Sequence, residues 1–181
     1  MEYVFSSGRL CFRKIEKGDF ARLCTIFQDI EIMYAWEHAF TEEEVRGWME
    51  EQAVRYQRDG FSYFAAMERK TGELIGVIGP LVETVGGKPA IGVAYILDKT
   101  FWGRGYATEG ARASMEYAFI HLGAKKVIAE IRPENLASQK VAQRLGMKRE
   151  GEFVKRYRGR DMVHWIYSIT AQEAAATEKK R

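Results

Sequence analysis

The chain has 181 residues, of which 46% are hydrophobic and 13% aromatic, and its formal net charge is +3. This length suits one domain, and the composition excludes a disordered chain, because disorder needs low hydrophobicity and high net charge. No run of about 18 apolar residues and no signal-peptide pattern is present, so we expect a soluble, cytoplasmic protein without a membrane contact. The mildly basic balance suits an anionic ligand and is weak evidence for nucleic acid.

The cysteines favour a reducing environment and give no sign of metal binding. Cys11 and Cys24 are the two cysteines of the chain, and they form no CxxC pair, metal-ligand spacing or disulfide framework. We therefore expect two buried free thiols, and we expect no metal site.

The first segment with a regular pattern predicts a strand followed by a helix. Leu10, Phe12 and Ile15 indicate a strand with a polar face. Asp19 then stands where it can cap a helix that begins at Phe20, because an aspartate side chain accepts hydrogen bonds from the first helical amides.

A capping box begins the second predicted helix. Thr41 precedes Glu44 by three residues, the spacing at which each side chain bonds the backbone N–H group of the other residue. The helical pattern continues to about Arg58, and Gly60 ends it. Apolar residues at helical spacing predict that one face of this helix is buried.

The rest of the chain alternates between strand and helix patterns and predicts one mixed α/β domain. The segments 62–69 and 73–83 are joined by Lys-Thr-Gly, a hairpin signal, and AIGVAYIL at 90–97 indicates a buried strand. The later elements are a helix at 107–122, a strand at 125–131, a short helix between Asn135 and Gly146, strands at 152–158 and 162–169, and a charged Ala/Glu/Lys tail at 171–181.

The segment FWGRGYATEG, residues 101–110, lies between the buried strand and the following helix. Unsatisfied amides at a helix start attract anions, and glycines let the backbone approach an anion closely. A pyrophosphate site and a plain strand-to-helix turn both fit, because a lone GxG is a weak motif. The candidate anion-binding residues are Gly103, Arg104, Gly105, Tyr106, Ala107 and Thr108.

Two other phosphate-binding motifs fit this segment poorly. The P-loop pattern, GxxxxGK followed by Ser or Thr, is absent. A dinucleotide-binding fingerprint needs a third glycine, where this chain has Thr108, and it needs the turn directly after the strand. Glu130, at the end of a later strand, matches the ribose-binding acid of that fold, so a nucleotide-dependent oxidoreductase is one alternative.

Three segments resemble the GNAT family of N-acetyltransferases, in particular the ribosomal-protein N-terminal acetyltransferases of the RimJ/RimL type. They are LCFRKIEKGDFARL at 10–23, LDKTFWGRGYATEGARASMEYAF at 97–119 and IRPENLASQKVAQRLGM at 131–147. The resemblance covers about Leu10 to Ile169. It implies a domain of residues 1–170 in which a strongly bent mixed sheet has helices on both faces, followed by the tail at 171–181.

The resemblance also implies where the co-substrate acetyl-CoA binds. The strands at 90–97 and 127–131 would be parallel neighbours that splay apart in a V, and the pantetheine arm would enter the V. A bulge in the first of these strands would leave the amides of Ile96 and Leu97 for the arm and for the thioester oxygen. A splayed edge has unpaired N–H groups, which a ligand can satisfy.

Further contacts follow from the same resemblance. The pyrophosphate would lie on the glycine segment, and Lys140 and Arg144, one helical turn apart, would face the 3′-phosphate of the adenosine. A solvated helix face is the alternative for this pair. The acceptor amine would bind near the first helices, where Tyr34 and Trp36 stand in a predicted loop.

The implied chemistry is direct attack of a free primary amine, either a peptide N-terminus or a small molecule, on the acetyl thioester. Many relatives place a tyrosine that acts as the acid where this chain has Ala142, so Ser138 is the candidate donor to the leaving thiolate, with an ordinary first-turn helix serine as the alternative. Asn135 can cap the same helix and also contact the cofactor or the substrate. Relatives often carry a glutamate where this chain has Gly92, so Glu130 is the candidate base. Proximity without a protein base is the alternative.

Several alternatives remain open at the level of sequence. Asp161 and His164 are further candidates for the base. The basic hairpin KRYRGR at 155–160 fits an RNA or acidic partner, or a solvated turn, and we do not expect nucleic acid. A non-catalytic acyl-CoA-binding module is the main rival to an enzyme. The expected ligands are acetyl-CoA and an amine acceptor, and the fold is compatible with a homodimer.

Overall fold

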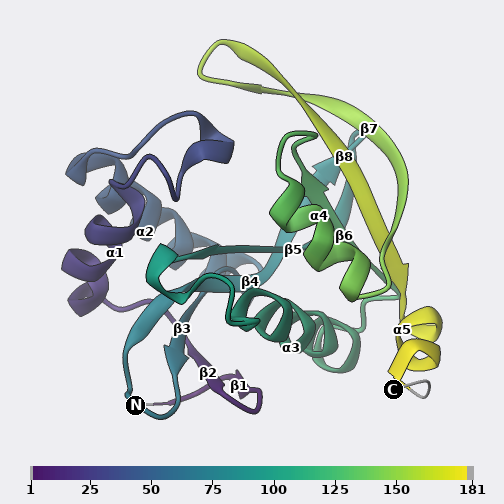
Figure 1. The fold of residues 1–181 in the computed structure, drawn as a ribbon, viewed down its shortest axis with the longest axis horizontal. Helices are drawn as coiled ribbons and strands as arrows, with labels where there is room; N and C mark the ends of the chain where they lie inside the picture. The colour runs from purple at the N-terminus through teal and green to yellow at the C-terminus, as the bar shows by residue number, and fades with distance from the viewer. Residues whose placement is uncertain (1, 179–181) are drawn as a thin grey trace.

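One mixed sheet organises the computed structural model, which describes residues 2–178 (Figure 1). Its strands are β1 (Phe5–Ser6), β2 (Leu10–Arg13), β3 (Phe64–Glu68), β4 (Leu74–Val85), β5 (Lys88–Leu97), β6 (Lys126–Ile131), β7 (Lys148–Tyr157) and β8 (Arg160–Thr170). They lie in the order β1-β2-β3-β4-β5-β6-β8-β7, antiparallel except for β5 and β6. The mixed α/β architecture expected from the sequence is confirmed.

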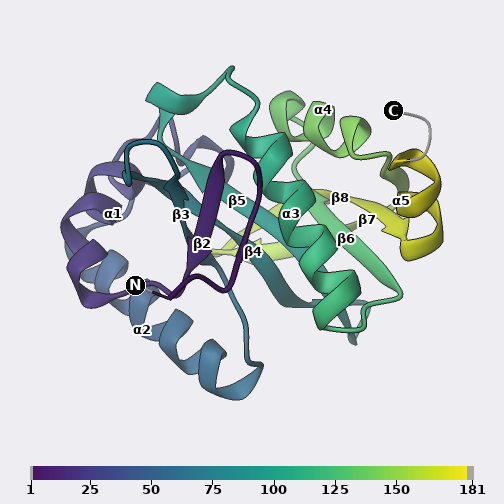
Figure 2. The ribbon, with the colours of Figure 1, turned by 90° about the horizontal axis from the view of Figure 1, so that it is seen from below.

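Helices cover both faces of the sheet (Figure 2). The α-helices are α1 (Phe20–Phe27), α2 (Glu42–Arg58), α3 (Tyr106–His121), α4 (Leu136–Arg144) and α5 (Ala171–Glu178), and the short 3₁₀ segments are η1 (Lys17–Asp19), η2 (Tyr34–Trp36) and η3 (Lys99–Phe101). Buried residues of α1 and α2 pack with Val77, Leu81 and Ile96 on one face. Residues of α3 and α4 pack with Val93 and Val127 on the other face. We call these the α1/α2 face and the α3/α4 face.

Local sequence signals fix most element boundaries. The Thr41 side chain accepts from the Glu44 amide and Glu44 accepts from the Thr41 amide, so the predicted capping box begins α2. Gly60 follows the helix with a φ of 84°, a conformation that glycine adopts without steric cost. Residues 171–178 of the segment expected as a charged tail form α5, which buries Ala174 against the sheet, whereas residues 179–181 of that expected tail lie outside the described residues.

The first strand and helix differ from expectation. All four residues of β2 are buried, because helices lie on both sides of it, so the expected polar face is absent. The Asp19 carboxylate does not cap α1 and instead binds the Arg13 guanidinium through two contacts of 2.7 Å. A charged residue buried in the sheet needs a paired partner, and this need determines where the Asp19 side chain points.

The centre of the sheet opens between β5 and β6. These parallel strands pair only where Ile91 meets Val127 and Gly92 meets Ile128, and β5 then continues to Leu97 without β6 beside it. The predicted V of splayed strands is therefore present. The pairing of β5 with β4 runs in unbroken register to Leu97, so the bulge that the resemblance implied in β5 is wrong.

Candidate active site

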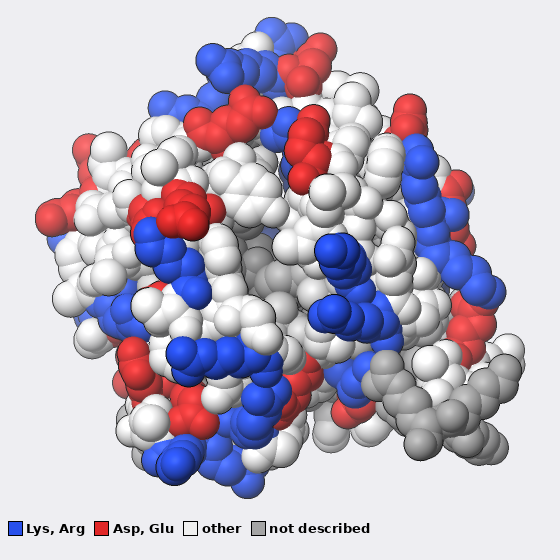
Figure 3. Space-filling view, viewed as in Figure 1, with Lys and Arg blue, Asp and Glu red and all other residues white. Residues whose placement is uncertain are grey.

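A cavity of about 220 Å³ occupies the V. Figure 3 shows this side of the molecule hollowed near its centre, with basic side chains at the rim of the hollow. The lining comes from β4, β5, β6, α3, α4, the β7–β8 hairpin and η2. The lining residues that matter below are Trp36, Glu83, Gly92, Tyr95, Glu130, Arg132, Asn135, Ser138, Lys155 and His164.

A chain of polar side chains joins β5 to α4 across the mouth of the V. The Tyr95 hydroxyl donates to Ser138 Oγ at 3.0 Å. Asn135 caps α4 by accepting from the Ser138 amide at 3.0 Å, and its Oδ1 also accepts from the Tyr34 hydroxyl at 2.5 Å. Burial raises the pKa of Tyr95 to about 12, so this phenol keeps its proton at neutral pH and can donate it in a hydrogen bond.

Two carboxylates and a lysine line another part of the cavity. Lys155 Nζ lies 3.0 Å from Glu130 Oε2 and 3.7 Å from Glu83 Oε2. A Cβ atom built on Gly92 would lie 2.9 Å from Glu83 Cγ, so the absence of a side chain at position 92 makes room for Glu83. Burial raises the pKa of the Glu83 carboxyl and lowers the pKa of the nearby His164.

Strand register places the two groups of side chains on opposite faces of the sheet. Glu83 and Gly92 share the face of Leu81, because side chains alternate along a strand and paired residues point the same way. This is the α1/α2 face, whereas Tyr95 lies with Val93 on the α3/α4 face. The cavity therefore passes between the splayed strands from one face of the sheet to the other.

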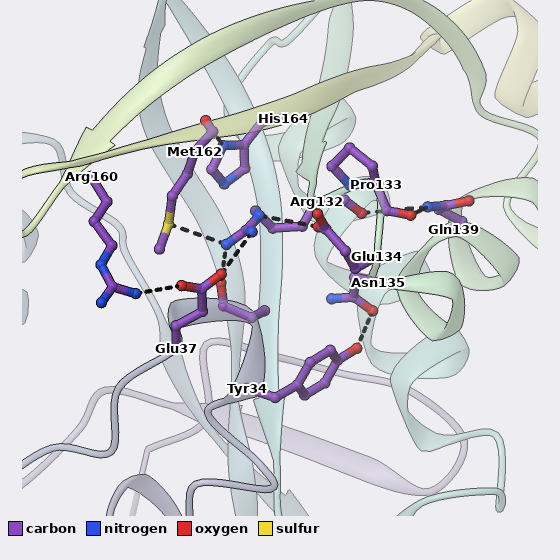
Figure 4. A network of polar contacts seen from close by, with 11 residues as sticks. Tyr34, Glu37, Arg132, Pro133, Glu134, Asn135, Gln139, Arg160, Met162 and His164 are labelled. Atoms are coloured by element: carbon purple, nitrogen blue, oxygen red, sulfur yellow. Dashed lines mark hydrogen bonds and ion pairs between the residues drawn. The ribbon is translucent and has the colours of Figure 1, made fainter.

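The η2 loop is tied to the opposite wall through Arg132, at the end of β6 (Figure 4). The Arg132 guanidinium donates to the Ala35 carbonyl at 3.2 Å and to Glu37 Oε1 at 3.0 Å, and it lies 3.3 Å from Glu134 Oε2. Arg160 from β8 binds the other oxygen of Glu37 at 3.1 Å. The bond from Arg132, with help from Arg160, holds the pKa of Glu37 below its usual range. This network fixes the wall that carries Trp36.

The glycine segment has the local geometry expected of an anion site. Gly103 and Gly105 have φ angles of 72° and 81°, and Gly105 is the residue before the first turn of α3. Gly105 offers no side chain to cap the helix amides, so these remain available to an anion. Arg104 is exposed, whereas the Tyr106 side chain is buried, so Tyr106 can offer a ligand only its backbone.

The structure places the remaining predicted residues as follows. The Asp98 amide donates to the Ile75 carbonyl, and ladder bonds alternate along β5, so the Ile96 amide points at β4 and the Leu97 amide points toward the V. The expectation that the Ile96 amide is free is therefore wrong.

Lys140 and Arg144 are exposed on α4. Trp36 and His164 line the cavity. Asp161 is exposed and does not line it.

Sequence reasoning missed Tyr95 and Glu83. Tyr95 stands in the apolar run of β5 and appeared as a core residue. Glu83 lies near the end of β4, nine positions from Gly92 in sequence but beside it in space. The hairpin turn at Gly86 and Gly87 was the available signal, because it sets the register that brings these positions together.

Charges on the β7–β8 hairpin are largely paired within the chain. Arg158 binds Glu44 at 2.7 Å and Arg160 binds Glu37, in addition to the contact between Lys155 and Glu130. Within residues 2–178, no helix is long and apolar enough to cross a membrane. The same described residues include no group of three His, Cys, Asp or Glu side chains that could hold a metal ion.

Comparison with known proteins places this arrangement in a family. The model of the acetyltransferase (GNAT) domain matches residues 9–148. The uncharacterized N-acetyltransferase YnaD of Bacillus subtilis is 30% identical over 151 residues, which are 83% of this chain and 85% of YnaD.

Solved structures share the fold over nearly the whole chain. A GNAT-family acetyltransferase from Bacillus anthracis superposes with a TM-score of 0.78 and 26% identity, covering 93% of this chain and 98% of that one. The ribosomal alpha-N-protein acetyltransferase RimL, in complex with coenzyme A, has a TM-score of 0.76 and 19% identity, covering 93% and 98% of the two chains. The chain therefore belongs to the GNAT acetyltransferase family and transfers the acetyl group of acetyl-CoA to an amine.

Proposed function

We propose that acetyl-CoA enters the V from the α3/α4 face and that the acceptor amine enters from the α1/α2 face. The observation that carries this proposal is the cavity that passes through the sheet between β5 and β6. Hydroxyl donors lie on one face of this opening and carboxylates on the other. A thioester needs donors for its oxygen and sulfur, and an amine needs a proton acceptor, so each partner meets the chemistry it requires.

The pyrophosphate is assigned to the amides of residues 103–108, at the start of α3. Their geometry supports this assignment, since the positive φ angles of Gly103 and Gly105 turn the chain into the helix and leave its first amides uncapped. Lys140 and Arg144 on α4 supply positive charge for the 3′-phosphate. The Leu97 amide, on the open side of β5, is the proposed donor to the thioester oxygen.

The thiolate leaves toward the hydroxyl pair of Ser138 and Tyr95. Ser138 is held by the Asn135 cap, and Tyr95 donates to it, so a donor on β5 takes the role for which relatives use the position of Ala142. Ala142 is itself buried in the cavity wall. The Ser138 hydroxyl is then the direct donor to the developing thiolate, and the buried Tyr95 phenol that donates to Ser138 strengthens this bond, because hydrogen bonds in a chain polarise one another where water does not compete.

The acceptor is a primary amine that passes the wall formed by Trp36 and held by Tyr34. A ribosomal-protein N-terminus, as in RimJ/RimL-type enzymes, is one such amine and small-molecule amines are another. Two free buried thiols, Cys11 and Cys24, favour a reducing compartment, so we propose that the enzyme works in the cytoplasm.

The test is thiol release from acetyl-CoA in the presence of a panel of amines. The panel contains alkyl diamines, aminoglycosides, free amino acids and peptides with a free N-terminus. Release above the rate of hydrolysis with at least one class is the expected result. Tight coenzyme A binding, measured by calorimetry, without release from any amine would contradict the proposal. A Gly103→Val/Gly105→Val variant should lose coenzyme A affinity, whereas a Gly123→Val variant, whose glycine follows α3, should keep it.

A further inference from the structure

We propose that Glu83 and Glu130 form the acceptor site, which binds an alkylammonium group and passes its proton to Glu83. This inference rests on the proposed function and names the substrate class for it. The acceptor is an aliphatic primary amine with a basic nitrogen, such as a diamine or a lysine side chain, rather than the α-amine of a peptide.

Glu130 carries one carboxylate oxygen that lacks a partner. Its side chain is 9% exposed, and Oε2 is bound by Lys155. The other oxygen, Oε1, is buried and has no hydrogen-bond partner among the described residues. Burying an ionised carboxylate oxygen without a donor is costly. An ammonium group, which has three N–H donors, would satisfy it.

Glu83 approaches the same space from β4. Its side chain occupies the room above Gly92, which is where relatives are expected to carry a glutamate of their own. The Glu83 carboxylate therefore reaches the V from β4, the strand next to β5, and it lies on the same face of the sheet as Gly92. Burial is the main cause of the raised pKa of Glu83, and such a carboxyl is a better proton acceptor than an exposed one.

The carboxylates around Glu83 outnumber the cations that bind them. Lys155 from β7 and Arg55 from α2 lower its pKa, and Glu130 from β6 raises it. The phenol of Tyr63, whose pKa is raised by burial, adds no charge. Arg55 is itself paired with Glu51 at 2.6 Å. Lys155 is the one cation that bridges the two carboxylates in the described part of the chain, so this cluster retains a negative charge that a bound ammonium would balance.

The other basic side chains of the cavity do not balance the negative charge of Glu83 and Glu130. Burial keeps His164 in its neutral form, because its pKa is lowered. Arg132 also lines the cavity, but its guanidinium is bound by Glu37 and lies beside Glu134. The contact of 3.0 Å between Lys155 Nζ and Glu130 Oε2 shows that a carboxylate of this site binds an alkylammonium group.

The proposed step balances atoms and charge. The bound ammonium gives one proton to Glu83, and the freed nitrogen lone pair forms a bond to the acetyl carbonyl carbon. The carbon–sulfur bond then breaks, and the second proton of the nitrogen reaches the thiolate through the hydroxyl pair of Tyr95 and Ser138. Glu83 returns its proton to solvent, so the products are the amide, coenzyme A and one proton.

The experiment compares wild type with Glu83→Gln and Glu130→Gln, using 1,4-diaminobutane and a lysine-free tripeptide as acceptors. Glu152→Gln is the matched control, because this glutamate is exposed on β7 and pairs with Arg149. Calorimetric titration with coenzyme A, which should give wild-type affinity in all variants, shows that each variant is folded.

We expect wild type to favour the diamine. Glu130→Gln should raise KM for the diamine about tenfold or more with a smaller change in kcat, because it removes one charge-assisted contact. Glu83→Gln should lower kcat about 10²- to 10⁴-fold. The wild-type kcat/KM should fall as the pH drops through the raised pKa of Glu83, and Glu83→Gln should lack this acidic limb.

Three results would overturn the inference. The first is a wild type that releases thiol with the tripeptide in preference to the diamine. The second is a pair of variants, Glu83→Gln and Glu130→Gln, that match wild type with the diamine. The third is an acidic limb that persists in Glu83→Gln. A wild type that releases thiol with no amine at all would instead refute the proposed function, and the inference with it.

Discussion

Replacing Tyr95 by phenylalanine tests the role of the hydroxyl pair. The structure shows a phenol that donates to Ser138 Oγ at 3.0 Å, next to the space where the sulfur would lie. Ser138 donates to the developing thiolate, and Tyr95 polarises the Ser138 hydroxyl. A hydrogen bond to a charged group contributes about 1.5–3 kcal/mol, so weakening the Ser138 bond by removing the phenol should lower kcat about 10- to 150-fold. KM for acetyl-CoA should change little, because the neutral thioester gains less from the donor than the thiolate does.

Two further measurements separate this role from a structural one. Ser138→Ala combined with Tyr95→Phe should cost clearly less than the product of the single effects, because the two hydroxyls form one hydrogen-bonded unit. An acetyl thioester with a more acidic thiol should restore much of the Tyr95→Phe rate, since a stable thiolate needs no donor. A Tyr117→Phe variant, on α3 outside the cavity lining, is the control. A kcat within twofold of wild type, or no rescue by the acidic thiol, would refute the reasoning.

Other predictions concern the cofactor loop and stability. Gly105→Val places a branched residue at a φ of 81°, with about 1–3 kcal/mol of backbone strain, and calorimetry should show weaker coenzyme A binding. Asp19→Ala leaves the buried Arg13 charge unpaired and should lower the free energy of unfolding in urea by about 3–5 kcal/mol; a loss under 1 kcal/mol would contradict this. Glu44, bound by Thr41 and other donors, has its pKa lowered to about 2. The stability it adds is present above its unfolded pKa of about 4.3 and is lost as the pH falls toward 2. In Glu44→Gln, the free energy of unfolding measured in urea should therefore change less with pH between about 4.3 and about 2 than it does in wild type. An unchanged pH dependence would contradict this prediction.

Sequence patterns located the elements of this fold well because their signals are local. The capping box at Thr41, the hairpin signal before β4 and the turn that starts α3 each depend on residues within a few positions of one another. The three family-like segments identified the family, which the comparisons confirm. The expected cap at Asp19 was wrong, because its partner Arg13 is a charge buried by tertiary packing.

The candidate site was predicted only in part. Ser138 and Asn135 were identified through a contiguous motif, and both line the cavity. Glu130 was identified at the lip of the V, but its pairing with Lys155 comes from the β6–β8–β7 registry and could not be seen in the sequence. The Ile96 amide was assigned to the ligand, yet the side to which an amide points depends on which ladder bonds form.

The sequence by itself determined the order of strands and helices, the glycine turn at the start of α3 and the family, since these depend on neighbouring residues and contiguous motifs. Tertiary structure decided which side chains meet. Strand register brought Glu83 above Gly92, and the divergence of β6 from β5 opened the space in which Tyr95 reaches Ser138. The physical reason is that these contacts depend on how separate elements pair and pack. A one-residue change in the register of a strand would turn its side chains to the opposite face, which would move Glu83 away from Gly92 and Tyr95 away from Ser138.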